Sequence, residues 1–264
     1  MLKLNKENYH CLQANLDYMS RGQYLDFTTG CEAATVASLK GEWVEEPSTA
    51  LLVGQYVHAF FEGALPDFMA NHPECFTKSG TLKAEFKQAE KMIETLKNDR
   101  LAMYTLEGQK EVIFTAEFAG APWKVMLDVY NPERRRIVDL KTTRSIIDHI
   151  WNPEYQTKLN FVEQYNYVTQ SALYAEIERR ASGRSEEDWF DFYLVAVSKQ
   201  DYPDKEVIDM RSPERYRDEL RQIEANMPRV LAVKNGREKP KHCGLCDYCR
   251  SVKKLTRAKH WTEL

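Results

Sequence analysis

The stretch that most constrains how this chain folds runs from Trp123 to Thr143 and reads WKVMLDVYNPERRRIVDLKTT. Trp123 to Tyr130 is apolar and β-branched, and Arg136 to Lys141 resumes an extended pattern after the turn-forming residues Asn131-Pro132-Glu133. This order predicts a β-hairpin whose strands are mostly buried.

Three charged side chains interrupt these two apolar strands. Because strand side chains alternate between faces, Asp139 and Lys141 are predicted to point the same way, with Val138 and Leu140 in the core. Asp128, on the first strand, is predicted to project to the same side. A surface ion pair is the simplest interpretation. Asp is nevertheless rare in strands, and burying a carboxylate is unfavourable unless it is paired or binds a metal, so a Mg²⁺ site is the alternative.

Asp128, followed after a turn by Asp139-Leu140-Lys141, resembles the PD-(D/E)xK signature of Mg²⁺-dependent nucleases, with Leu127-Asp128 in place of Pro-Asp. The sequence DLKTT (139–143) is similar to the corresponding motif in the branch that contains the RecB nuclease domain, lambda exonuclease and the RecE exonuclease. The resemblance implies an α/β, restriction-endonuclease-like fold in which helices flank a central mixed sheet. It also implies that Asp128, Asp139 and Lys141 are catalytic.

An apolar helix is predicted from Ala50 to Glu62. His58 follows Gly54 by four residues and precedes Glu62 by four, so the three share one helix face. A lone histidine on such a helix is more often a core residue than a ligand. The resemblance of this Gly-x3-His pattern to the RecB and RecE branch implies the opposite, with His58 as a metal ligand and Glu62 as an additional participant.

The same resemblance implies the remaining ligands and the substrate contacts. Mg²⁺ or Mn²⁺ is expected to bind His58, Asp128, Asp139 and the carbonyl of Leu140. Two glutamates of the strand that begins near Lys110 are further candidates, Glu111 and Glu117, and the spacing of Glu111 fits better.

A helix is predicted from Phe161 to Arg180, with Gln170 and Tyr174 one turn apart on one face. An amphipathic helix with a buried tyrosine is the simpler interpretation. This Gln-x3-Tyr resembles the motif that follows Asp-x-Lys in RecB-type families, which implies that both residues contact the substrate backbone.

Six cysteines in a chain expected to be cytoplasmic are more often free, catalytic or metal-binding than disulfide-bonded. Cys243, Cys246 and Cys249 form C-x2-C-x2-C and can surround one metal centre if a fourth ligand joins them. His242 as that ligand favours zinc, whereas a distant cysteine favours an iron–sulfur cluster. In several RecB-type nucleases an N-terminal cysteine completes a [4Fe-4S] cluster, and Cys31 stands at the corresponding place. Free thiols are the third alternative.

Length and composition predict one domain, 1–264, with ordinary hydrophobic content. Within it we expect an N-terminal helical segment (1–49), a helical insertion (65–108) and a Cys-rich tail (236–264). A central strand is predicted from Trp189 to Val197, an edge strand from Glu206 to Met210, and a helix from Ser212 to Lys234. The polar start of the chain and the lack of a long apolar run predict a cytoplasmic protein without membrane contact.

The net charge of −3 and pI of 6.1 differ from the basic character of most nucleic-acid-binding domains. A cleft can be locally basic in an acidic protein, however, and bound metal neutralises carboxylates. The composition is therefore compatible with a nuclease.

In its overall layout, from Ser20 to Cys249, the chain most resembles RecE-type phage exonucleases. The resemblance implies 5′ to 3′ degradation of double-stranded DNA ends in phage-type recombination, a homo-oligomer, and a single-strand annealing protein as partner. Two other functions stay open. One is a RecB-like or CRISPR-adaptation-like iron–sulfur nuclease on single-stranded DNA, and the other is a non-catalytic, zinc-stabilised module that binds DNA or protein.

Overall fold

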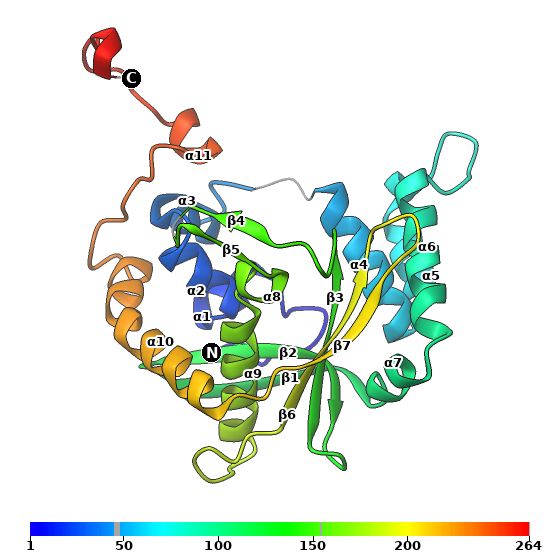
Figure 1. Cartoon of the computed structure of the whole chain (residues 1–264). Helices are drawn as coiled ribbons and strands as arrows, with labels where there is room; N and C mark the ends of the chain where they lie inside the picture. The colour runs from blue at the N-terminus through cyan, green and yellow to red at the C-terminus, as the bar shows by residue number, and fades with distance from the viewer. Residues whose placement is uncertain (45–47, 154, 264) are drawn as a thin grey trace.

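A five-stranded mixed sheet forms the centre of the computed structural model, which describes residues 1–44, 48–153 and 155–263 (Figure 1). Residues 45–47 and 264 of the predicted terminal segments lie outside these ranges. The strand order is β1-β2-β3-β6-β7, and only β3 and β6 run parallel. The strands are β1 (Gln109–Phe118), β2 (Ala121–Asn131), β3 (Arg136–Thr143), β6 (Asp191–Ser198) and β7 (Lys205–Asp209). The mixed sheet and the hairpin are thus confirmed.

The hairpin strands β2 and β3 stay together only near their turn. Their pairing runs from Asn131 opposite Arg136 to Val129 opposite Val138. Beyond it, β2 continues against β1, whereas β3 continues against β6 as far as Thr143. At the point of separation an oxygen of the Asp128 side chain, Oδ2, accepts a hydrogen bond from the backbone N–H of Leu140 at 2.8 Å. A side chain therefore replaces the missing ladder bond, and the sheet opens beside Asp128.

Helices cover both faces of the sheet, and their apolar stripes form two core clusters. One cluster includes Leu127 and Ile137 and is covered by α2 (Arg21–Thr28), α3 (Glu32–Leu39), α9 (Tyr167–Ala181) and α10 (Pro213–Lys234). The other includes Val129, Val138 and Leu140 and is covered by α4 (Thr49–Glu62), α6 (Ala84–Lys97) and α7 (Arg100–Thr105). Leu127 and Val129 fall in opposite clusters although side chains two apart normally share a face. The strand is therefore distorted at Asp128.

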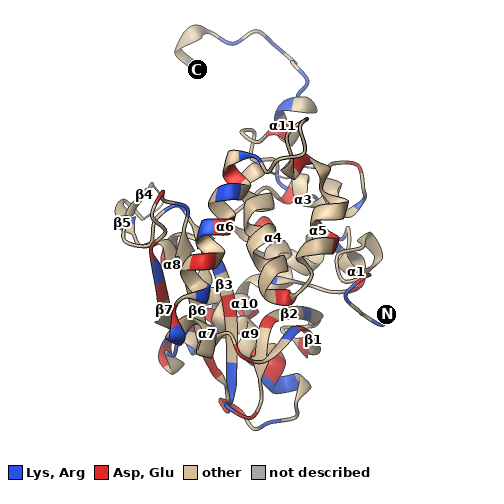
Figure 2. Cartoon of the chain, turned by 90° about the vertical axis from the view of Figure 1, so that its right-hand side faces the viewer, with Lys and Arg blue, Asp and Glu red and all other residues tan. Residues whose placement is uncertain are grey.

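The segment predicted as a helical insertion forms most of one helical layer. It contains α5 (Leu65–Asn71), the short 3-10 helix η1 (Pro73–Cys75), α6 and α7. Acidic and basic residues are interspersed along α6, as Figure 2 shows. Its opposite side buries five apolar residues in the core: Phe86, Ala89, Met92, Ile93 and Leu96. One side of α6 is therefore solvated and the other side is buried in the core.

The N-terminal segment expected to be helical contains α1 (Leu12–Asp17), α2 and α3. The Ser20 hydroxyl caps α2 by accepting from the N–H of Gln23 at 3.4 Å, and Cys31 immediately precedes α3. The predicted strand and helix after residue 189 are also present as β6, β7 and α10.

The prediction of one helix from Phe161 to Arg180 is wrong. The segment forms α8 (Phe161–Gln164) and α9, separated by Asn166 in the left-handed conformation with φ of 54°. Asparagine tolerates this conformation better than most residues. The guanidinium of Arg21 donates to the carbonyl oxygens of Tyr165 and Asn166, which stabilises the break. Ahead of α8, the expected loop contains a small hairpin of β4 (Ile150–Asn152) and β5 (Thr157–Leu159).

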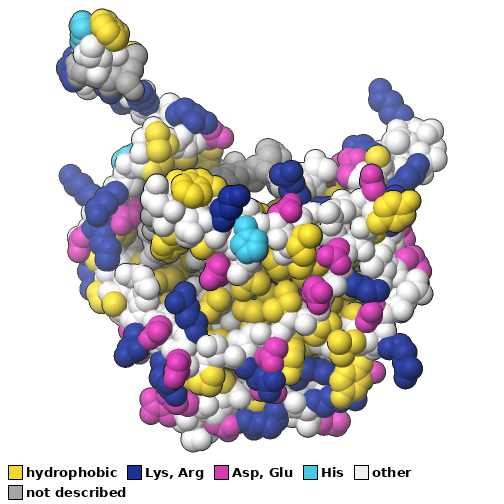
Figure 3. Space-filling model, in the orientation of Figure 1, with side chains coloured by type: hydrophobic (Ala, Val, Ile, Leu, Met, Phe, Trp, Pro, Cys, Tyr) yellow, Lys and Arg dark blue, Asp and Glu magenta, His cyan; other side chains and the backbone are white. Residues whose placement is uncertain are grey.

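The C-terminal tail leaves α10, runs to α11 (Asp247–Ser251) beside α3, and ends in the 3-10 helix η2 (Trp261–Glu263), as Figure 1 shows. In the space-filling view from the same side, apolar side chains gather in the middle of the face and charged ones surround them (Figure 3). No helix in the described part of the chain combines the length and apolar character that crossing a bilayer requires.

Candidate active site

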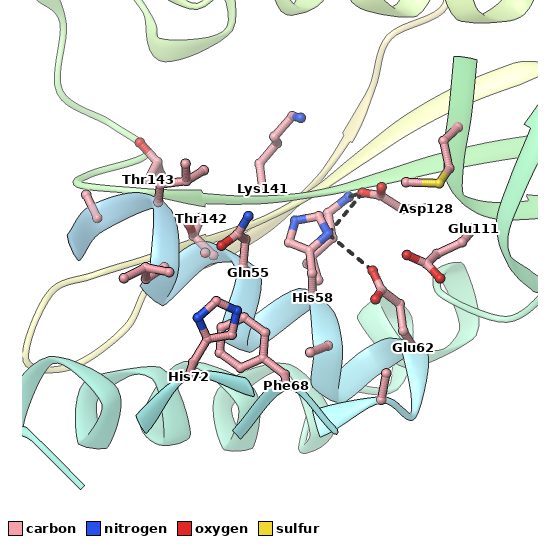
Figure 4. A pocket seen from close by; sticks show the side chains of 18 of the residues that line it. Gln55, His58, Glu62, Phe68, His72, Glu111, Asp128, Lys141, Thr142 and Thr143 are labelled. Carbon is pink, nitrogen blue, oxygen red and sulfur yellow. Dashed lines mark hydrogen bonds and ion pairs between the residues drawn. The ribbon is translucent and has the colours of Figure 1, made fainter. Parts of the chain in front are cut away.

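A cleft of about 990 Å³ lies beside α4, where β2 and β3 separate. Most of the predicted site residues line it, and Figure 4 shows several of them around the ring of His58. They are His58, Glu62, Glu111, Asp128, Leu140 and Lys141. The opening of the sheet therefore brings residues from α4, β1, β2 and β3 into one space.

Asp128 lies at the centre of this group. Its Oδ2 atom, which accepts the Leu140 N–H, is also 3.5 Å from Nδ1 of His58. The side chain retains 23% of its surface, so it is accessible from the cleft. Burial, and then the negative charge of Asp139, raise the pKa of Asp128 to about 6, against the opposing effects of His58 and Lys141.

Asp139 lies deeper, with a side chain that is only 6% exposed. Its Oδ1 accepts a hydrogen bond from Nε2 of Gln170 on α9, and its Oδ2 lies 2.6 Å from Nζ of Lys141. Burial alone would lower the pKa of Lys141, but the charges of Asp139, Tyr167 and Asp128 reverse this effect and raise it. Lys141 is therefore an ammonium group that is paired with Asp139 and also stabilised by the charge of Asp128.

The Gly-x3-His pattern has a clear structural reason. A Cβ atom on Gly54 would lie 3.2 Å from the Thr142 hydroxyl oxygen, so glycine lets α4 approach β3 closely. One turn later, the same helix presents His58 to Asp128. Close packing of α4 on β3 therefore sets the position of the histidine.

Two glutamates complete an acidic wall around His58. Glu62 Oε1 is 3.8 Å from His58 Nδ1, and Glu111 pairs with Lys6 at 2.8 Å. Burial and the charges of Glu111 and Asp128 raise the pKa of Glu62 to about 7, although His58 opposes the shift. Glu111 has φ of 52° inside β1, opposite the distortion at Asp128.

Four residues predicted at this site do not line the cleft: Asp139 and Gln170 are buried next to Lys141, and Glu117 and Tyr174 lie farther away. Glu117 is exposed near the other end of β1, about 20 Å from Glu111 along the strand. Tyr174 packs edge-on against Phe192, with ring centroids 6.4 Å apart, and is not among the residues that line the cleft. Of the Gln-x3-Tyr pair, only Gln170 contacts the aspartates.

Sequence reasoning missed several side chains that line the cleft. Tyr167 is the clearest, because Nζ of Lys141 lies over its ring at 4.7 Å from the centroid. Arg144 and Lys199 add positive charge to the lining. The break before α9 brings Tyr167 to this place, and no local sequence pattern indicated that break.

The donor set suits a hard divalent cation. Oε1 of Gln170 is buried and accepts no hydrogen bond from the described residues, and the buried Oδ2 of Asp139 lies 2.6 Å from Nζ of Lys141. Burial, and then the charges of neighbouring carboxylates, raise the pKa values of Asp128 and Glu62, and a cation bound between them would oppose both effects. Carboxylate oxygens with a nearby imidazole are ligands that such cations accept.

A second group of ligand-type side chains lies away from the cleft. Cys31, Cys243, Cys246 and Cys249 have sulfur atoms within 4.8 Å of one another. None of the four lines the cleft. The backbone N–H groups of Cys246 and Leu245 lower the pKa of Cys243 to about 6. The predicted association of Cys31 with the tail is therefore present in the fold.

Two comparisons relate the chain to known proteins. The profile of a family described as "PDDEXK-like domain of unknown function" matches residues 20–252. A crystal structure described as "Putative exonuclease" from Eubacterium rectale is 40% identical, covers 100% of this chain and 98% of its own, and has a TM-score of 0.93. A second solved structure is 14% identical and has a TM-score of 0.31, which is too low for a structural conclusion. Among curated proteins, none matches.

Proposed function

This chain belongs to the family of PDDEXK-like domains, and from that premise we propose that it is a metal-dependent nuclease that hydrolyses DNA phosphodiester bonds. One observation carries the proposal: Asp128, Asp139 and Lys141 meet where β2 leaves β3, with His58 of α4 beside them. Asp139 is buried, and its carboxylate contacts both the Lys141 ammonium and the Gln170 amide. An ordinary ion pair on the protein surface needs neither this burial nor the second contact.

We propose that Asp128, Asp139, His58 and the Leu140 carbonyl hold Mg²⁺ or Mn²⁺. When bound, the cation supplies a water of lowered pKa and neutralises charge on the scissile phosphate. The chain's own task is to place these ligands: the opening of the sheet brings Asp128 and Leu140 to the cleft, and Asp139 is buried next to Lys141, which lines the cleft.

Lys141 acts as a fixed cation in this proposal. Its pKa is raised, so it is protonated and donates hydrogen bonds to a phosphate oxygen or to the attacking water. The ring of Tyr167 supports the ammonium group, and Gln170 fixes the carboxylate of Asp139. Arg144 and Lys199 on the cleft lining attract the remaining phosphates.

We extend the proposal to an exonuclease that acts on double-stranded DNA ends. The crystal structure with 40% identity carries an exonuclease description, which supports this activity. The order of motifs in this chain resembles that of the RecE-type enzymes. On this resemblance we propose 5′ to 3′ polarity, a homo-oligomer, and a single-strand annealing protein as partner in phage-type recombination.

The test compares linear duplex, circular duplex and linear single-stranded DNA, each with Mg²⁺ and with a chelator. We expect linear duplex to be degraded only with the metal, and circular duplex to survive. Label at the 5′ end should be released before label at the 3′ end.

Each of the other outcomes would contradict one part of the proposed function. Cleavage of circular duplex would contradict an exonuclease, and preference for the single strand would favour the RecB-like alternative. Absence of cleavage with Mg²⁺ and with Mn²⁺ on all substrates would contradict a nuclease.

A further inference from the structure

Four thiols from distant parts of the sequence meet at the surface beside α3. Sγ of Cys31 is 3.5 Å from Sγ of Cys249, and Sγ of Cys243 is 3.9 Å from the same atom. All four sulfur atoms, including that of Cys246, lie within 4.8 Å of one another. Cys31 and Cys249 are separated by 218 residues, so the fold and not the motif alone assembles this set.

The spacing of the sulfur atoms discriminates between two kinds of metal centre. A zinc ion binds cysteine sulfur at about 2.3 Å, and a tetrahedron with that bond length places its sulfurs about 3.8 Å apart. A [4Fe-4S] cluster holds four irons inside its thiolates, so its cysteine sulfurs must lie farther apart. Separations of 3.5 and 3.9 Å, with all four sulfur atoms within 4.8 Å of one another, fit a single ion better than a cluster.

The backbone around the thiols also favours bound thiolates. The N–H groups of Leu245 and Cys246 donate to Sγ of Cys243 at 3.4 and 3.3 Å, and the N–H of Cys249 donates to Sγ of Cys246 at 3.4 Å. Gly244 has φ of 76°, the left-handed conformation that turns the chain back around Cys243. The loop therefore aims amide dipoles at sulfur, which stabilises negative charge there.

A separate set of contacts docks the tail before it reaches the cysteines. Glu32, the first residue of α3, accepts from the backbone N–H of Lys241 at 2.7 Å and pairs with Arg229 of α10, also at 2.7 Å. The N–H of Ala33 donates to the Lys241 carbonyl at 3.1 Å. The tail is thus held in place next to Cys31 by groups that are not ligands.

We propose that Cys31, Cys243, Cys246 and Cys249 bind one structural zinc ion that fastens the C-terminal tail to α3. His242 is not a ligand in this arrangement. Its ring stacks on Tyr248, with centroids 6.2 Å apart, and its Nδ1 is 3.5 Å from Sγ of Cys249, where it supports the thiolate from outside. Tyr248 also contacts Trp43, so the zinc site adds a contact to the residues that directly follow α3.

The test measures zinc, iron and acid-labile sulfide per chain in full-length protein. Cells are grown with both metals supplied, and the protein is purified without oxygen so that an iron–sulfur cluster would survive. We expect one zinc per chain, no iron or sulfide, and a colourless protein. Stoichiometric iron with sulfide would overturn the proposal, and so would a protein without metal.

Four variants identify the ligands. Cys31→Ser and Cys249→Ser should lower zinc from about one per chain to nearly none. Cys11→Ser is the matched control, because serine also caps α1 and Cys11 lies outside the group. His242→Ala should retain zinc. Loss of zinc in either control, or full zinc in Cys31→Ser, would contradict the assigned ligand set.

A measurement on unmodified protein covers the case in which the cysteine variants do not fold. A mercurial thiol reagent added with a chromogenic zinc indicator should release one zinc as four thiols react. The same treatment should open the tail to trypsin at Arg250, inside α11, without affecting the helical signal of the remaining chain. Thiol modification without zinc release would overturn the proposal.

Discussion

Gln170 is the residue that fixes the most buried carboxylate of the site. It donates to Oδ1 of Asp139 from α9, while Lys141 approaches the other carboxylate oxygen. Without the Gln170 amide, the Asp139 carboxylate would keep Lys141 as its partner and could rotate about its side-chain bond. Gln170 is therefore a positioning residue for Asp139, and in the proposed site it would act on the metal through that carboxylate.

We predict that Gln170→Ala raises the Mg²⁺ concentration for half-maximal cleavage by about 10- to 100-fold, as replacement of groups that orient metal ligands typically does. Saturating Mg²⁺ should restore much of the rate. Titration of cleavage against Mg²⁺ measures this shift. Tyr174→Phe, on the same helix but away from the cleft, is the control and should leave the titration unchanged. An unaltered metal requirement in Gln170→Ala would show that the amide does not position Asp139.

At the scale of elements, the contact of α4 with β3 determines where His58 lies. Gly54 is the residue that permits this contact, because a side chain there meets the Thr142 hydroxyl. Displacement of α4 by even about 1 Å would separate the imidazole from Asp128, and such misplacements cost about 100-fold in rate.

We predict that Gly54→Val lowers cleavage by about 10- to 100-fold. The added methyl groups push α4 away from β3, so removal of the opposing hydroxyl in Thr142→Ala should restore part of the loss. A double-mutant cycle of cleavage rates checks this coupling. Simple additivity of the two substitutions would contradict a steric contact between Gly54 and Thr142.

The strands and their charged residues could be predicted from sequence because the signals are local. Period-two alternation places Asp139 and Lys141 on one side, and turn residues mark the hairpin. The break before α9 depends instead on a hydrogen bond from Arg21, which is 145 residues away from Asn166. Tyr167 was missed for that reason. Glu111 and Glu117 share one strand, and only the distortion opposite Asp128 brings the first into the cleft.

At the scale of the whole molecule, Lys234 joins the N-terminal helices to α10. Its ammonium donates to the carbonyls of Asn15 and Tyr18 at 2.8 and 2.7 Å and to Oε1 of Gln23 at 2.8 Å. Burial, together with the charge of Lys124, lowers the pKa of Lys234 to about 8. One partly buried cation thus holds α10 against the N-terminal helices.

We predict that Lys234→Met lowers the free energy of unfolding by about 2 kcal/mol at neutral pH, because carbonyl groups lose their donor. The unfolded chain binds the lysine proton up to a pKa of about 10.4, so between pH 8 and 10 it holds more protons than the folded chain does. Stability of the wild type relative to Lys234→Met should therefore increase as pH rises through this range. Urea unfolding at several pH values measures the difference. Lys239→Met, at an exposed position, is the control, and a difference that falls with pH would contradict the assignment.

The central claim is that a divalent cation held by Asp128 and Asp139 carries out phosphodiester hydrolysis. The most direct measurement is the Mg²⁺-dependent cleavage rate of linear duplex DNA by wild type, Asp139→Asn and Glu117→Gln, with thermal melts to establish that each is folded. The account predicts a loss of about 1000-fold for Asp139→Asn and an unchanged rate for Glu117→Gln, whose side chain is far from the cleft. A folded Asp139→Asn protein that cleaves within a few-fold of wild type would contradict it.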